Sequence, residues 1–378
     1  MEKLIGEVIT GKFLFFIRFG LEVEMNKISA LLIILVFLLV NCSKDTGSFT
    51  ASETDQYAID QQEIIDVINS MEAENSDENY FYMGLDDQLE DNFDDPNNLD
   101  KLFAFSLTKQ IVPVKFRRII RPYKRNLEII DQTDSTATVL LTNYALGRFV
   151  ILASNNIITE NKKADSLYRV IKWLGHRVQR YAKLIKNDSS KWKLRAVSLA
   201  SGESLSKADS STSNTTLDIE KVVLQVNDGD MVEIVEPLRY FVTRETVFHF
   251  DPSDRVTVTV YISNSTMNPV YQPDRSTEKV RIHIDRHHSF KPKHQNKDNK
   301  SHIRNGFAFH RILDLNYLGK EGELNVYQGS WEVRHRIGVN HAVVDVIDNG
   351  SIFDDAEDIY PYNSVTWHTP YIINNPSK

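Results

Sequence analysis

The stretch RVTVTVYISN, Arg255–Asn264, carries the pattern on which the fold prediction depends. Val256, Val258 and Val260 alternate with residues that tolerate water. Successive side chains of a strand point to opposite faces, so this alternation predicts a strand with one buried face in an antiparallel sheet. β-branched and aromatic residues also favour strands.

Similar runs continue on both sides of this stretch. The others are LDIEKVVLQV (217–226), MVEIVEPLRYFV (231–242), EKVRIHID (278–285), GFAFHRILDLNYL (306–318), ELNVYQGSWEVRHRI (323–337) and HAVVDVID (341–348). Seven short strands separated by turns predict a two-sheet sandwich. The series resembles the Ig-like β-sandwich superfamily, although the inter-sheet cysteine pair of antibody domains is absent. The resemblance implies an all-β Ig-like domain over residues 217–378.

The sequence before residue 205 has a different pattern of polar and apolar residues. YAIDQQEIIDVINSM, 57–71, spaces Ile64, Ile68 and Met71 as one face of a helix. From about Lys115 the runs are typical of strands, and LEIIDQTDSTATVLLTNY (127–144) predicts a hairpin around its Asp-rich break. KWKLRAVS, 191–198, closes the series. This order resembles the NTF2-like fold, and the resemblance implies an α+β domain over residues 55–204, in which a curved antiparallel sheet wraps around helices.

The segment 167–185 permits two interpretations. Leu167, Val170, Ile171 and Leu174 fit a helical stripe, and the stripe continues to Ile185. YAKLIKNDSSKWKLRAVSLAS, 181–201, instead reads as two strands joined by a polar turn at 187–189, and we expect strands there. Downstream, the Ser- and Thr-rich stretch ending at Thr216 is nearly free of apolar residues, which predicts a linker at 205–216 between two domains.

The single cysteine of the chain, Cys42, follows an apolar run. MNKISALLIILVFLLVNC, 25–42, places Lys27 before about thirteen largely apolar residues. As a helix that run rises roughly 20 Å, less than the roughly 30 Å hydrocarbon core, so it predicts a signal peptide rather than a membrane span. Leu39–Cys42 resembles the lipobox of bacterial lipoproteins, with Asn41 where Gly, Ala or Ser is usual. The resemblance implies that Cys42 carries acyl chains such as palmitate and begins the mature chain.

The lipobox resemblance also implies a cellular location. We expect a signal peptide over residues 1–41, in which 1–24 precede Met25, the preferred initiator, and a lipid-anchored tether over residues 42–54. Ser43 stands where Asp would retain an enterobacterial lipoprotein at the inner membrane. The expected location is therefore the bacterial cell envelope, with the outer membrane favoured and the folded part facing the periplasm or the cell surface. Several acyl chains would anchor the protein stably.

Composition excludes several classes of protein. A formal charge of -8 opposes general nucleic-acid binding, which needs a basic face. One cysteine excludes an intrachain disulfide framework and a cysteine-based zinc cluster. The acidic stretch 72–100 lacks the spacing of an EF-hand, so we interpret it as a solvated loop.

Candidate chemistry is sparse. The chain lacks the common nucleophile, metalloprotease, P-loop and dinucleotide-binding motifs, so we predict no catalytic residue and no cofactor. His283, His287 and His288 have a spacing that can ligate zinc or copper. Lys and Arg residues crowd the same segment and oppose a metal cation, which favours a solvated loop.

The sequence thus predicts a non-catalytic, lipid-anchored envelope module that binds or assembles a protein or glycan partner. Its oligomeric state is left open. Two alternatives remain: a hydrolase or isomerase that uses an NTF2-like pocket, and metal capture by the His-rich loop.

Overall fold

A computed structural model describes residues 53–72, 81, 112–120, 124–154, 167–286, 311–334 and 337–375. The chain divides into two compact units, Met1–Tyr57 and Ala58–Lys378. Of the described residues, the first unit contains only the start of helix α2. All the strands lie in the second unit, which is described below.

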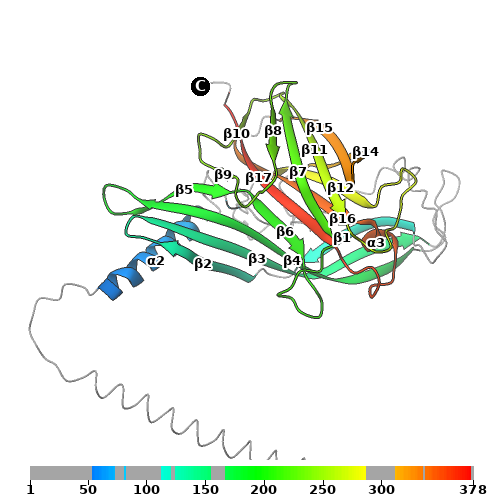
Figure 1. The fold of residues 1–378 in the computed structure, drawn as a ribbon, viewed down its shortest axis with the longest axis horizontal. Helices are drawn as coiled ribbons and strands as arrows, with labels where there is room; N and C mark the ends of the chain where they lie inside the picture. Colours follow the sequence, from blue (N-terminus) through cyan, green and yellow to red (C-terminus); the bar gives the residue numbers. More distant parts are fainter. Residues whose placement is uncertain are drawn as a thin grey trace, which may run out of the picture. The chain divides into compact units, whose positions relative to one another are not determined.

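Strands dominate the second unit (Figure 1). The helices are α2 (Glu53–Glu72) and α3 (Asn349–Phe353). The strands before residue 205 are β1 (Val112–Ile120), β2 (Lys124–Gln132), β3 (Thr136–Ser154), β4 (Leu167–Lys186), β5 (Trp192–Ser198) and β6 (Ala200–Ser204). Those after it are β7 (Leu217–Val226), β8 (Met231–Ile234), β9 (Phe241–Val242), β10 (Phe248–Phe250), β11 (Arg255–Asn264), β12 (Glu278–Arg286), β13 (Arg311–Asp314), β14 (Asn316–Glu321), β15 (Leu324–Glu332), β16 (Gly338–Asp348) and β17 (Ser364–Ile373).

The strands form two sheets. The main sheet has twelve strands, with the central order β1-β3-β4-β6-β17-β16-β12-β13. The smaller sheet has five, in the order β14-β15-β11-β7-β8. In Figure 1 the red strand β17 runs beside β6, and the long strands β3 and β4 extend away from them. The main sheet thus takes strands from both sides of the 205–216 segment.

The 205–216 segment forms a compact connection between β6 and β7. Leu205 is buried and bridges to Ser213. The Asn214 amide donates to the carbonyl oxygen of Tyr362 at 3.3 Å, and Thr216 accepts from the Asn363 amide at 2.7 Å. These bonds fix the segment against the chain that enters β17.

The predicted fold class, an NTF2-like α+β domain followed by an Ig-like sandwich, is wrong. The structure is mostly β, with curled antiparallel sheets and two helices among the described residues. Strands of the C-terminal half and α3 cover much of the inner face of β1, β3 and β4, through contacts such as Arg118–Asp345 and Lys172–Gly350. The single helix α2 packs near the end of β4, where Asp60 pairs with Lys186. An NTF2-like sheet would wrap around helices instead. A separate Ig-like sandwich is excluded because β12, β16 and β17 belong to the main sheet.

Several local predictions are confirmed. The helix predicted over 57–71 lies within α2, where Ile64 and Ile68 are fully buried against the main core. The hairpins predicted within 127–144 and 181–201 are β2–β3 and β4–β5.

The helical interpretation of residues 167–185 is wrong. Those residues form the single strand β4, which pairs with β3 along its whole length up to Ile185. Lys172, His176 and Arg180 lie on its buried face together with apolar residues. Polar residues on this inner face interrupt the apolar alternation that would have marked a strand in the sequence.

β16 separates the two layers of the core and is buried on both faces. On one face, Val344 and Val346 pack in the main core with Val258 and Val260 of the smaller sheet. On the other, Ile347 packs in a second cluster that includes Phe149. The candidate sites lie in these two layers.

Candidate functional site

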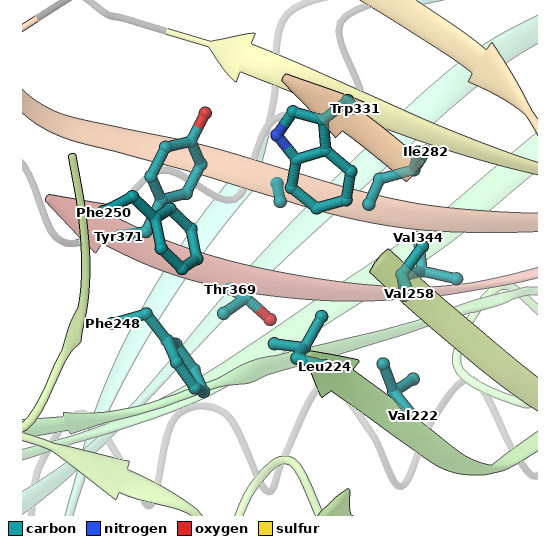
Figure 2. A pocket seen from close by; sticks show the side chains of 11 residues that line it. Val222, Leu224, Phe248, Phe250, Val258, Ile282, Trp331, Val344, Thr369 and Tyr371 are labelled. Carbon is teal, nitrogen blue, oxygen red and sulfur yellow. The ribbon is translucent and has the colours of Figure 1, made fainter. Parts of the chain in front are cut away.

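A pocket opens between the two sheets of the second unit (Figure 2). Strands from both sheets build it, so its walls belong to distant parts of the sequence. Its lining residues are Val222, Leu224, Phe248, Phe250, Val258, Ile282, Trp331, Ala342, Val344, Thr369 and Tyr371. The cavity has a volume of about 20 Å³. Such a volume suits a water molecule or a group as slender as a methyl.

The short strand β10 arranges the aromatic wall of the pocket. β10 runs parallel to β17, and this pairing places Phe248 opposite Tyr371. Because side chains alternate along a strand, Phe248 and Phe250 project to the same side. The rings of Phe250 and Tyr371 lie 5.2 Å apart, and those of Phe248 and Phe250 lie 6.5 Å apart. Aromatic pairs at such distances stabilise the packing beyond the apolar area that they bury.

Trp331 of β15 adds an indole ring to this wall. Its side chain is 6 % exposed and is part of the main core. The indole Nε1 is buried and has no hydrogen-bond partner among the described residues. Figure 2 shows that nitrogen on the edge of the ring that faces Tyr371 in this view. The indole nitrogen is a donor only, so it can be satisfied only by an acceptor.

A pair of buried carboxylates lies in the same inter-sheet layer. Glu278 of β12 and Asp348 of β16 are directly opposite each other in the sheet register. The Asn264 amide donates to Glu278 Oε2 at 3.0 Å and to Asp348 Oδ2 at 3.4 Å. Burial raises the pKa of both carboxyls, and hydrogen bonds from neighbouring side chains offset part of that rise.

The protein itself provides the partners of this carboxylate pair. Asn325 donates to Glu278 Oε1 at 2.8 Å, Thr266 donates to Asp348 Oδ2 at 2.9 Å, and the Gly350 backbone N–H donates to Asp348 Oδ1 at 2.7 Å. The last bond caps helix α3. The pair therefore ties strand ends to α3 and is not directed at an open site.

The other face of β16 carries a buried ion pair. Arg118 of β1 donates to both oxygens of Asp345, at 2.8 and 2.7 Å. His283 Nε2 lies 3.3 Å from the Asp345 carboxylate, and Ser364 lies 3.2 Å from it. Burial alone would raise the pKa of Asp345, but the Arg118 charge and the hydrogen bond from His283 hold that pKa well below its usual value.

Lys172 is a second buried cation on this side. Its Nζ donates to the backbone carbonyls of Gly350 at 3.0 Å and Tyr360 at 2.6 Å. Burial lowers the pKa of Lys172 to about 8, although the nearby carboxylates, Asp354 first, act in the opposite direction. Lys172 thus holds α3 and the following loop against β4.

The sequence-predicted site residues are only partly described. His283 lies on β12, buried, beside a carboxylate that Arg118 already neutralises. His287, His288 and Cys42 lie outside the described residues. Within the described ranges no group of three or more His, Cys, Asp or Glu side chains is arranged to hold a metal ion. The alternative that the His-rich segment captures zinc or copper stays a hypothesis.

Sequence reasoning missed the pocket. Trp331 lay in a predicted strand, and its spacing from Tyr327 indicates only that the two share a face. Phe248 and Phe250 belong to a strand of three residues, too short for a periodic signal.

Comparisons with known proteins identify no family for this chain. No family model matches the chain. No curated protein matches it. A solved structure of Extended-Synaptotagmin 2, containing its SMP domain and two C2 domains, is 7 % identical, covers 72 % of this chain and 90 % of its own, and has a TM-score of 0.11. A likeness at that score carries no argument. Among the described residues, no helix combines the length and apolar character required to cross a bilayer.

Proposed function

We propose that this chain is a lipid-anchored protein of the bacterial cell envelope that binds or assembles a partner without catalysis. We further propose that the inter-sheet pocket is its ligand site. The observation that supports the second point is the lining of the pocket, which is apolar and aromatic apart from Trp331 Nε1 and the hydroxyls of Thr369 and Tyr371. Such a lining suits binding: apolar walls with a few polar groups give affinity and orientation.

The anchor in this proposal is Cys42, which follows the apolar run 28–40. The chain between Cys42 and Glu53 can span at most about 40 Å. An acylated Cys42 would therefore keep the folded unit close to the membrane and raise the effective concentration of its site for envelope partners. Ser43 favours the outer membrane.

The buried ionisable groups support binding over chemistry. Asp345 is paired with Arg118, and Lys172 donates to two backbone carbonyls. Glu278 and Asp348 accept from neighbouring amides and hydroxyls. The hydrogen bonds of these groups are made within the fold and stabilise it. The enzyme alternative rested on an NTF2-like pocket and is not carried forward, because that fold class is wrong.

One experiment tests the anchor. Cells expressing the wild type, Cys42→Ala or the control Ser43→Ala would be fed an alkyne-tagged fatty acid, fractionated and crosslinked. We expect label and membrane association in the wild type and in Ser43→Ala, and neither in Cys42→Ala. An unlabelled wild-type chain would overturn the lipoprotein assignment.

A second comparison tests the pocket. Ala342 lines it, so Ala342→Val adds two methyl groups to a cavity of about 20 Å³. We expect crosslinked partners to be lost in Ala342→Val and retained in Gln328→Ala, which alters an exposed residue of β15. Equal recovery of partners from both variants would count against the pocket as the site.

A further inference from the structure

We propose that the outer face of β1, β3 and β4 is a docking surface for an anionic lipid bilayer. This face is opposite to the one that carries Arg118 and Lys172. In Figure 1, β3 and β4 lie on the side of the second unit away from β8 and β15. The proposal is carried by a block of neighbouring side chains that are basic or apolar. It concerns a different surface from the pocket and goes beyond the proposed function.

The sheet register arranges this block in three rows. Side chains alternate along a strand, and Arg118, Phe149 and Lys172 point inward, so the residues on either side of each point outward. Paired positions on β1, β3 and β4 lie side by side across the strands. The rows are Ile119 with Arg148 and Trp173, Arg117 with Val150 and Ile171, and Lys115 with Leu152 and Arg169.

The charge of the rows is wholly positive. Each row contains Lys or Arg and none contains Asp or Glu, although the whole chain has a formal charge of -8. Within the described ranges, Arg117, Arg148 and Arg169 form no ion pair with a carboxylate. The rows therefore hold an excess of positive charge, which complements the phosphates of an anionic membrane.

The carboxylates that border the rows already have cationic partners. Further along the outer face of β4, Arg177 pairs with Glu203 of β6. At the edge of β4, Glu357 accepts from the Trp173 backbone N–H at 2.6 Å and pairs with Lys207 at 3.1 Å. Neither carboxylate is directed at the arginines of the rows, so the positive charge of the face is not cancelled by its surroundings.

Apolar side chains on the same face are exposed. Ile119 and Ile171 are 40 % and 45 % exposed, and Leu146, two residues before Arg148 on β3, is 40 % exposed. Exposed apolar groups that cluster on one face mark an interaction surface. On a bilayer such groups reach the acyl boundary, while the long arginine side chains keep their charged ends among the headgroups.

Trp173 is the aromatic member of this face. The benzene part of its indole occupies the space that a Cβ on Gly175 would need, so the ring lies against the sheet. Tryptophan is enriched where protein meets the headgroup level of a membrane. Trp192, Trp331 and Trp367 are at most 6 % exposed, so contact with lipid can be read from Trp173.

Contact quenching of tryptophan fluorescence tests the proposal. The full-length chain is placed in nanodiscs of brominated phosphatidylglycerol or brominated phosphatidylcholine, because bromine quenches an indole only at close contact. Both discs offer the same acyl chains to residues 28–42, so the comparison isolates the headgroup. We expect quenching in phosphatidylglycerol, little in phosphatidylcholine, and loss of the quenched signal in Trp173→Phe.

The variant Arg148→Gln with Arg169→Gln removes two exposed charges from the rows. Each basic residue near an anionic surface strengthens binding about fivefold, so the docking equilibrium should weaken about 25-fold. The matched control, Arg239→Gln with Arg255→Gln, removes two exposed arginines outside β1, β3 and β4 and should leave the quenching unchanged. Salt screens exposed charges, so wild-type quenching should also fall as NaCl rises from about 0.1 to about 1 M.

Equal quenching in the two kinds of disc, no quenching in either, or an equal loss in the control variant overturns the proposal. A shift of Trp173 emission with dextran sulfate, without quenching by phosphatidylglycerol, would assign the face to an acidic glycan and overturn it as well. Fatty-acid labelling of Cys42 is measured separately, so failure of this face would leave the proposed anchor standing.

Discussion

Arg118 and Asp345 are 227 residues apart in the sequence, and their side chains form a two-pronged ion pair with N–O distances of 2.8 and 2.7 Å. Both side chains are buried. The pair holds β1 against the face of β16 that carries Asp345, so the main sheet must curl. The Arg118 guanidinium also lies 5.4 Å from the centre of the Tyr362 ring. One contact thus connects the two halves of the chain.

Removal of the negative charge at this pair should destabilise the protein strongly. Asp345→Asn leaves the Arg118 charge buried without its counterion, and we expect a loss of about 3–5 kcal/mol in the free energy of unfolding. Urea denaturation measures it. The matched control is Glu203→Gln, whose partner Arg177 is partly exposed, with an expected loss of at most about 1 kcal/mol. Similar losses in both variants would contradict the role given to Asp345.

A methyl group at Gly202 should also destabilise the fold. A Cβ there would clash with Thr366 Oγ1 and would lie 2.7 Å from His176 Nε2, because β6 runs between β4 and β17. We expect Gly202→Ala to cost about 1–3 kcal/mol, measured as a shift in the urea midpoint. Adding Thr366→Ala should recover part of that loss. Strict additivity of the two changes would show that the clash is not the cause.

The contribution of Lys172 to stability should rise with pH. Its pKa is about 8 in the folded protein against an ordinary value of 10.5, so between these values the unfolded chain binds a proton that the folded chain does not. The free energy of unfolding of the wild type, relative to Lys172→Met, should therefore increase from pH 8 to 10.5, by at most about 3 kcal/mol. Urea denaturation of both proteins at several pH values provides the curve. A flat difference would contradict the buried position of Lys172.

The contribution of Glu278 to stability should fall as the pH rises. Burial raises its pKa in the folded state above the ordinary value of 4.5, so its contribution is present in acid and is lost as the pH rises through the folded-state pKa. The stability of the wild type relative to Glu278→Gln should fall as the pH rises from 4.5 towards neutrality. Glu332→Gln, at an exposed position of β15, is the control and should change stability by less than about 0.5 kcal/mol. A growing advantage of the wild type towards neutral pH would refute the sign.

Sequence patterns located most of the strands but not their partners. Residues 217–226 and 255–264 were predicted as strands and coincide with β7 and β11. Each of these strands has one more exposed and one buried face, and the alternation of polar and apolar residues reveals this. β4 lacked that signal because Lys172, His176 and Arg180 occupy its inner face. Their burial depends on carbonyls and aromatic rings from the far half of the chain, which no local window contains.

The pocket was harder to predict for the same reason. Its aromatic wall joins Phe250 to Tyr371, and Trp331 reaches it from another sheet. Each residue looks like ordinary core in its own strand. Only the parallel pairing of β10 with β17, together with the packing of the two sheets, brings them around one cavity. Pairing between distant strands is set by the whole fold rather than by local periodicity.

The place of β17 between β6 and β16 has a consequence for how the protein is made. Ser364 at its start bonds to Ser204, a residue that the ribosome adds 160 positions earlier. β6 and β16 can be joined in the main sheet only after β17 has been synthesised. Such distant pairing slows folding, and it leaves the facing edges of β6 and β16 without their strand partner during that interval.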